Sequence, residues 1–193
     1  MNDIGNFLNN FSEKTINIWK NNLYRYVRYL KDMKTYIFDF DNTLVYSESS
    51  TRVIDANGRT IKKFYDDSYN QYALKDGEQF NFDDFNNPDK LKNVRFTKYW
   101  NFLKYLYERN ENIFILTARK DKQILIDFFN RFNMYLNIIC INSSNDYSSN
   151  NIKKRTAIER LKESGYSGFV YYDDCVENIA EVHKLGYVNC KLV

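Results

Sequence analysis

Acidic side chains follow two apolar stretches of the sequence. Asp39 comes directly after the residues TYIF and Asp41 follows two residues later, and Asp173 and Asp174 come directly after FVYY. Carboxylates are seldom placed among buried apolar residues unless a cation or hydrogen bonds compensate them. Residues two apart in a strand lie on the same face, so the side chains of Asp39 and Asp41, at the end of one buried strand, can point into a common site.

Apolar, strand-like stretches alternate with helical patterns along most of the chain. We expect strands over 35–40, 112–119, 137–142, 167–174 and 187–193, and helices over 95–110, 121–134, 151–165 and 176–186. Asn151 is the expected N-cap of its helix, and Gly165 and Gly186 are expected to end theirs. The alternation is typical of a parallel sheet covered on both faces. We therefore predict an α/β fold, a Rossmann-like three-layer sandwich with a central, mostly parallel sheet.

The carboxyl ends of parallel strands form the usual ligand-binding edge of such a sheet. The stretch IFILTAR brings Thr117 and Arg119 to that edge, and a helix that follows another strand brings Lys153 or Lys154. Crowded carboxylates repel one another unless a cation intervenes, and ligands that are all oxygens favour Mg²⁺. A divalent ion beside a lysine and a hydroxyl would suit a phosphate dianion.

Helical periodicity distinguishes the two lysines. Ile158 and Leu161 mark the buried face of the helix, and Lys154 lies four and seven residues before them. Lys153 is rotated away from that face by about 100°. We therefore predict that Lys154 reaches the site.

Two segments fall outside the alternation: residues 1–34 precede the predicted core at 35–193, and residues 46–93 interrupt it. An insertion at 46–93 contains Asn57-Gly58 between two β-prone runs, which is a strong hairpin signal. This insertion carries nine acidic and seven basic residues, so it is not a basic clamp. Residues 1–34 form a separate extension, predicted to contain an amphipathic helix with Ser12 as its N-cap. That helix would pack on the domain or form a surface for a partner or a substrate, and the oligomeric state stays open.

The composition excludes several classes of protein. The net charge of +3 is too small to indicate a nucleic-acid binder by itself. The three cysteines form no Cys-x-x-Cys pair and there is one histidine, which argues against a zinc site. No apolar run approaches the roughly 20 residues of a membrane span. We expect a soluble, cytoplasmic protein that has no contact with a membrane.

Four short motifs resemble those of the haloacid dehalogenase-like (HAD) superfamily, in the order of that family. DFDNT at 39–43 resembles the first motif and ILTAR at 115–119 the second. IKKRTAIERL at 152–161 resembles the lysine-bearing third motif, and YYDDCVENI at 171–179 resembles the acidic fourth motif. The resemblance extends from Tyr36 to Val193 and leaves out the first 34 residues.

The resemblance implies a Mg²⁺-dependent phosphatase or phosphotransferase. Asp39 would be the nucleophile that forms an aspartyl-phosphate, and Asp41 would act as general acid and then general base. The catalytic set is completed by Thr117 and Lys154. Mg²⁺ would be held by Asp39, the Asp41 carbonyl and the fourth motif, with Asp174 as a direct ligand and Asp173 behind it. The substrate would contact Thr43, Thr117, Ala118, Arg119 and Lys154, although Arg119 can equally be a structural ion pair.

The substrate class stays open at this level. The ILTAR and Asp-Asp variants are similar to phosphatase domains of nucleic-acid end-repair enzymes and to small phage- or virus-type members of the superfamily. The expected partner is therefore a phosphorylated small molecule or a nucleic-acid end. DNTLVYS is also similar to phosphoprotein phosphatases of the polymerase-tail type. The remaining alternative is a non-catalytic binding protein that retains the fold.

Overall fold

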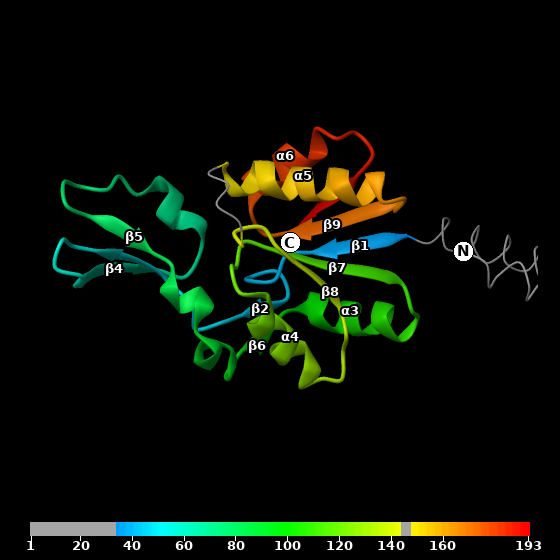
Figure 1. Ribbon diagram of the computed structural model, residues 1–193, viewed down its shortest axis with the longest axis horizontal. Helices are drawn as coiled ribbons and strands as arrows, with labels where there is room; N and C mark the ends of the chain where they lie inside the picture. The colour runs from blue at the N-terminus through cyan, green and yellow to red at the C-terminus, as the bar shows by residue number, and fades with distance from the viewer. Residues whose placement is uncertain (1–33, 144–147) are drawn as a thin grey trace, which may run out of the picture.

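A parallel five-stranded sheet forms the centre of the molecule. The computed structural model describes residues 34–143 and 148–193, so the predicted N-terminal helix and Ser12 lie outside the described residues. The strand order is β10 (Asn189–Leu192), β9 (Phe169–Asp173), β1 (Thr35–Phe38), β7 (Asn112–Thr117) and β8 (Asn137–Cys140), and every neighbouring pair is parallel (Figure 1). The predicted α/β fold is confirmed.

Two layers of helices cover the sheet because alternate strand residues point to opposite faces. Phe38 and Ile115 pack with α3 (Lys98–Glu108) and α4 (Lys122–Asn130) in one core cluster. Ile37 and Leu116 pack with α5 (Asn150–Glu163) and α6 (Val176–His183) in the other. Figure 1 shows these two pairs of helices on opposite sides of the sheet. The result is the predicted three-layer sandwich.

Some element boundaries differ from those predicted. The helix α5 begins one residue earlier than expected, and Ser149, not Asn151, occupies its N-cap position. Asn151 lies in the first turn, where its amide oxygen accepts from the Ile152 backbone N–H at 2.8 Å. Residues 95–96 form the strand β6 instead of the start of a helix, because they pair with β2 (Val45–Tyr46). The helix α3 begins after Thr97, whose hydroxyl accepts from the Tyr99 backbone N–H.

The insertion forms a small antiparallel sheet, which we call the cap. Its strand order is β4 (Thr60–Phe64), β3 (Thr51–Ile54) and β5 (Gln79–Asn81), and three short 3₁₀ helices accompany it, η1 (Asp67–Gln71), η2 (Asp83–Asn86) and η3 (Pro88–Leu91). The predicted hairpin joins β3 and β4. Gly58 takes a φ of +77° and Asp55 accepts hydrogen bonds from two backbone N–H groups of the turn. The third strand was not predicted.

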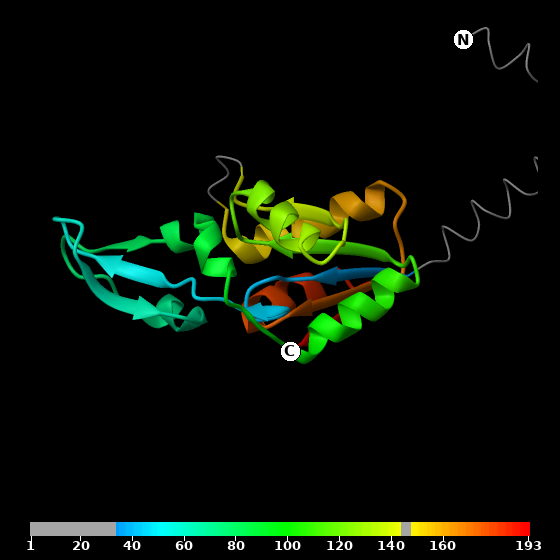
Figure 2. The same cartoon turned by 90° about the horizontal axis from the view of Figure 1, so that it is seen from below.

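The cap lies beyond the carboxyl ends of the core strands. Figures 1 and 2 show it projecting from that edge of the molecule in both views. Among the residues that the structure describes, none of the helices has the length and apolar character needed to cross a membrane. The arrangement leaves the ligand-binding edge of the parallel sheet facing the cap.

Candidate active site

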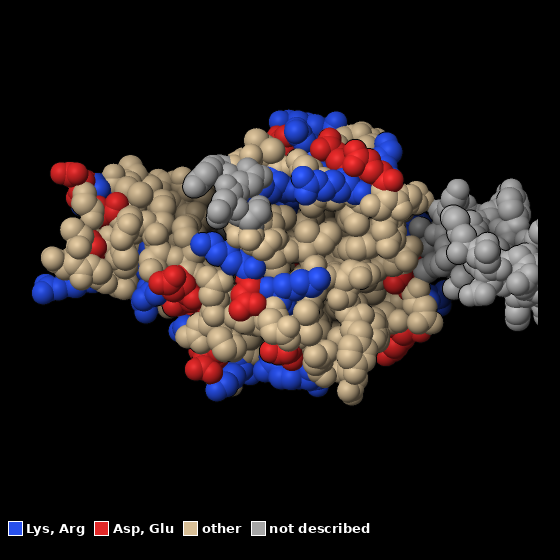
Figure 3. Space-filling model, viewed as in Figure 1, with Lys and Arg blue, Asp and Glu red and all other residues tan. Residues whose placement is uncertain are grey.

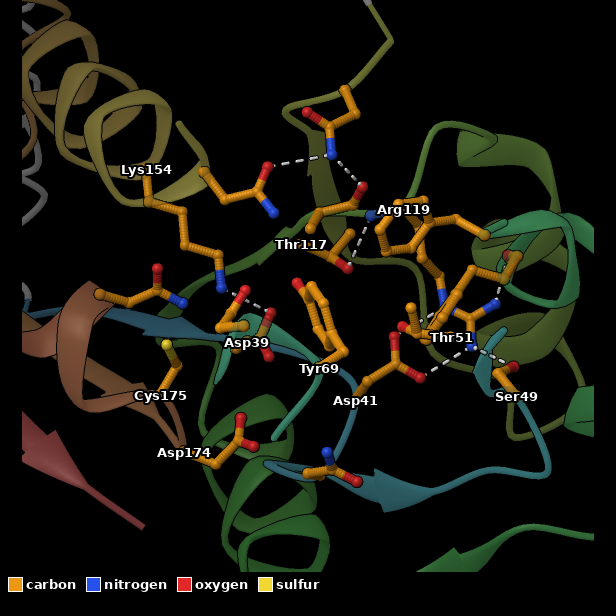
Figure 4. A pocket seen from close by; sticks show the side chains of 18 of the residues that line it. Asp39, Asp41, Ser49, Thr51, Tyr69, Thr117, Arg119, Lys154, Asp174 and Cys175 are labelled. Carbon is orange, nitrogen blue, oxygen red and sulfur yellow. Dashed lines mark hydrogen bonds and ion pairs between the residues drawn. The ribbon is translucent and has the colours of Figure 1, made fainter. Parts of the chain in front are cut away.

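A cavity of about 580 Å³ lies between the carboxyl edge of the sheet and the cap. On the side of the parallel sheet, the residues that line it include Asp39, Asp41, Thr117, Lys154 and Asp174, which come from four separate parts of the sequence (Figure 4). The structure therefore brings together the acidic, hydroxyl and basic side chains that the four motifs predicted. A volume of this size fits a small organic ligand.

The chain turns sharply after β1, and this turn presents the first two aspartates. The Asp39 backbone N–H still donates to the Tyr172 carbonyl at 2.9 Å, as in the strand. Asn42 then takes a φ of +59°, a region that asparagine tolerates better than most residues. The Leu44 N–H closes the turn by donating to the Phe40 carbonyl at 3.0 Å. As a result, Asp39 stays in line with the strand while Asp41 lies in the turn.

Lys154 lies between two of the aspartates. Its Nζ is 2.9 Å from Asp39 Oδ1 and 2.7 Å from Asp173 Oδ2, and the lysine is only 2% exposed. Lys153 instead donates to Asn142 Oδ1 at 2.8 Å. The helical periodicity thus selected the lysine that contacts the nucleophile candidate.

Asp173 has its hydrogen-bonding capacity filled by the protein. It is fully buried, and its Oδ1 accepts from the Cys175 backbone N–H at 2.8 Å. Its Oδ2 accepts from Lys154 and from the Tyr171 hydroxyl, and the Asn178 amide donates to both oxygens at 3.1 Å. A carboxylate offers about four lone-pair positions, and these donors occupy them. Asp173 is thus suited to holding Lys154 in place.

The charges of this cluster oppose one another. Burial raises the pKa of Asp39 well above its ordinary range, Lys154 counteracts this rise, and Asp173 and Asp174 add to it. Burial alone would lower the pKa of Lys154, but Asp173 and Asp39 outweigh it and hold that pKa well above its usual value. The lysine therefore stays charged, and the crowded carboxylates call for further positive charge.

The donor set fits a hard divalent cation. Asp39, Asp173 and Asp174 each offer a carboxylate oxygen, and these atoms all lie within 4.8 Å of one another. Because the oxygens of Asp173 are already engaged, Asp39 and Asp174 are the side chains best able to hold an ion there. Oxygen ligands of this kind suit Mg²⁺.

Arg119 holds Asp41 and two groups of the insertion. Its Nε donates to Asp41 Oδ2 and its Nη2 to Asp41 Oδ1, both at 2.8 Å. It also donates to the Ser49 hydroxyl at 3.1 Å and to the Phe85 carbonyl at 2.5 Å. A guanidinium has five N–H donors, so at most one is left for a ligand. Of the two roles predicted for Arg119, this geometry favours the structural ion pair.

The remaining predicted substrate contacts divide into two groups. Thr117, the last residue of β7, lines the cavity together with Ala118. The Ala118 carbonyl accepts from the Asn142 amide at 2.7 Å. Thr43 is fully buried, and its hydroxyl donates to Asp174 Oδ1 at 3.3 Å. Thr43 thus orients a metal-ligand candidate from behind the cavity wall.

Several residues of this site were not predicted from the sequence. Tyr171 and Asn178, which bond Asp173, lie in the fourth motif but have no distinctive spacing. Ser49 and Phe85 hold Arg119 from the insertion, and four aromatic residues of the insertion line the cavity. No pattern in the insertion indicated which of its many aromatic residues would face the core.

Comparison with known proteins supports the fold. No family model matches the chain, and no curated protein is similar to it in sequence. A chain in the solved structure of the Pnkp1/Rnl/Hen1 RNA repair complex matches it with a TM-score of 0.53 at 15% sequence identity. The match covers 83% of this chain and 42% of that chain. At this identity the likeness shows a shared fold, over less than half of the longer chain.

Proposed function

We propose that this chain is a Mg²⁺-dependent phosphomonoester hydrolase of the HAD type, with Asp39 as its nucleophile. The observation that carries the proposal is the cluster at the carboxyl edge of the sheet. There, Lys154 bridges Asp39 and Asp173, and Asp174 completes a set of carboxylate oxygens within 4.8 Å. Phosphoryl transfer demands positioning and charge neutralisation more than covalent chemistry from the protein.

The side chains of the site divide the reaction between them. An Asp39 oxygen attacks the phosphorus and the ester bond breaks, which leaves an aspartyl-phosphate and an alkoxide that takes a proton from Asp41. Water then attacks the phosphorus, Asp41 accepts its proton, and phosphate leaves with Asp39 restored. Asp41 accepts from Arg119 on both oxygens and from the Ser47 hydroxyl on Oδ1, which leaves about one lone-pair position, on Oδ2, for the proton.

The other polar groups stabilise charge on the transferred group. The Thr117 hydroxyl would donate to a phosphoryl oxygen, and Lys154 would neutralise charge on Asp39 and the phosphate. Asp39, the Asp41 carbonyl and Asp174 would hold Mg²⁺. Its positive charge would compensate the negative charges of the carboxylates and the phosphate.

The substrate we propose is the phosphate of a nucleotide or of a nucleic-acid end. Two observations support this choice. The motif variants resemble those of end-repair phosphatases, and the chain shares its fold with a chain of an RNA repair complex. The lack of net positive charge on the insertion indicates that few additional phosphates would be bound.

Phosphate release from a panel of phosphoesters tests the proposal. The panel contains nucleotides, phosphorylated oligonucleotides, sugar phosphates and phosphopeptides, each assayed with Mg²⁺ or with EDTA. We expect Mg²⁺-dependent release that Asp39→Asn abolishes, and a beryllofluoride adduct at Asp39 in the wild-type chain. An inert chain that forms no adduct would instead indicate a binding protein that retains the fold. Release from phosphopeptides alone would indicate a phosphoprotein phosphatase.

A further inference from the structure

The wall of the cavity opposite the catalytic carboxylates is aromatic. Tyr65, Tyr69, Phe82 and Phe85 line the cavity, and all four belong to the insertion. Tyr65 is 63% exposed and Phe82 is 42% exposed, so their rings are not used up in packing the cap. Aromatic rings at the rim of a polar site offer flat surfaces on which a planar group can stack.

Tyr69 is the best placed of these rings. It comes from η1 and packs edge-on against Phe80 and Phe82, with ring centroids 5.6 Å apart in each case. Asp66 precedes η1 and accepts from the Ser68 backbone N–H at 3.0 Å, which anchors the start of this short helix. In Figure 4 the Tyr69 side chain reaches into the cavity between Asp39 and Thr51. The ring is thus held in place on the cap and is presented to the catalytic side of the cavity.

The charge of the cavity argues against a ligand with many phosphates. Its lining includes five acidic residues and three basic ones, and two of the basic residues, Arg119 and Lys154, are already paired with aspartates. On the face shown in Figure 3, Lys and Arg side chains are interspersed with Asp and Glu, without one broad basic surface. A site of this kind suits one phosphoryl group joined to an uncharged flat group.

Amide side chains lie beside the aromatic rings. Asn70 and Asn86 line the cavity from the cap. An amide offers both donors and an acceptor, which match the hydrogen-bonding edges of nucleobases. Stacking on aromatic rings combined with hydrogen bonds to base edges is the usual way in which proteins hold an unstacked base.

From these observations, we propose that the cap is a base-binding platform in which Tyr69 stacks on the base of the nucleotide whose phosphate reaches Asp39. This proposal rests on the phosphatase function proposed above and names its substrate class, a phosphomonoester that carries a nucleobase. Recognition extends over one nucleotide, because the ring and the catalytic carboxylates face the same cavity of about 580 Å³.

Hydrolysis of adenosine 5′-monophosphate and ribose 5-phosphate tests the platform, because ribose 5-phosphate carries a hydroxyl at the carbon where the nucleotide carries its base. We expect the wild-type chain to prefer the nucleotide in kcat/KM. Tyr69→Leu should lower this preference about tenfold, the effect of losing one base–aromatic stack, and Tyr69→Phe should retain it. Tyr135→Leu is the matched control, since Tyr135 is exposed and lies outside the cavity lining. An unchanged preference in Tyr69→Leu, or a wild-type preference for phosphotyrosine over the nucleotide, would overturn the inference.

Two further measurements separate the possible outcomes. If the wild-type chain hydrolyses neither compound nor any other phosphoester of the panel, the phosphatase function fails, and calorimetric binding of the nucleotide then decides on the platform. Binding that Tyr69→Leu weakens would uphold it, and absence of binding would refute it. A 5′-phosphorylated tetranucleotide with a higher kcat/KM than the mononucleotide would assign the platform to nucleic-acid ends. An equal or lower value would assign it to free nucleotides.

Discussion

Replacing Lys154 with methionine removes the cation that lies between Asp39 and Asp173, and the consequences can be worked out from the structure. The lysine is 2% exposed and forms contacts of 2.9 and 2.7 Å with the two carboxylates. Removing one partner from a buried ion pair costs about 3–5 kcal/mol of folding free energy. Methionine has a similar length, so most of this cost would be electrostatic.

Proton uptake limits the cost. Protonating a carboxylate above its pKa costs roughly 1.4 kcal/mol for each pH unit. For an ordinary pKa near 3.9, protonation at pH 7 therefore costs about 4 kcal/mol. Asp39 is the group that would take the proton, because burial and its acidic neighbours already raise its pKa. We therefore expect Lys154→Met to lower the free energy of unfolding by about 3–4 kcal/mol at pH 7 in EDTA.

The same reasoning predicts a dependence on pH. Lys154 counteracts the rise of the Asp39 pKa, so removing it raises that pKa in the folded state further above the unfolded value. Between the folded-state pKa values of the wild-type chain and of the variant, only the folded variant binds the extra proton, so the variant loses stability relative to the wild type as the pH rises and regains it as the pH is lowered. Between pH 7 and pH 5 the loss caused by Lys154→Met should shrink by up to about 3 kcal/mol.

Urea denaturation followed by circular dichroism, in EDTA at pH 5 and pH 7, measures both effects. Lys153→Met is the matched control, because the Lys153 ammonium contacts the Asn142 amide and should cost little. The double variant Lys154→Met/Asp39→Asn should recover much of the lost stability, since it also removes one of the crowded carboxylates. A loss below about 0.5 kcal/mol at pH 7, the scale of an ordinary surface substitution, or a loss independent of pH would refute this account of the cluster.

Further predictions concern the metal, a thiol and the cap. The Tm in about 10 mM Mg²⁺ should be about 3–6 °C higher than the Tm in EDTA, for a Mg²⁺ concentration near ten times the Kd. Asp174→Asn should abolish this shift in a thermal melt, and an equal shift in that variant would place the ion elsewhere. Burial raises the pKa of the Cys140 thiol to about 11. At pH 8 iodoacetamide should therefore alkylate Cys175 well before Cys140 in the native chain, and similar rates by peptide mass spectrometry would contradict this. Gly58 has a φ of +77° with no atom within 4 Å of an added Cβ. Gly58→Ala should therefore lower the free energy of unfolding, measured by urea denaturation, by about 1 kcal/mol, because alanine is strained at this φ. Asn57→Ala should leave it nearly unchanged. Equal effects of the two substitutions would disprove the turn geometry.

Local periodicity was sufficient to predict the core of this protein. Strands of period 2 and helices of period 3.6 leave their pattern in consecutive residues, so the alternation along the chain predicted the parallel sheet and its two helical layers. The same logic indicated that Asp39 follows a buried strand and that Lys154 shares a helix face with Ile158. These inferences succeeded because each depends on residues close together in the sequence.

The arrangement of the site depends on contacts between distant residues, which leave no such pattern. Arg119 pairs with Asp41 across 78 positions and reaches Phe85 across 34. Asp173 differs from Asp174 because four neighbouring groups donate to it, and none of these contacts can be worked out from the two adjacent letters in the sequence. Tyr69 faces the cavity because the cap folds over the carboxyl edge of the sheet. The full set of hydrogen bonds to Asp173 and the orientation of the Tyr69 ring are results of packing, and packing brings these residues together only in the folded chain.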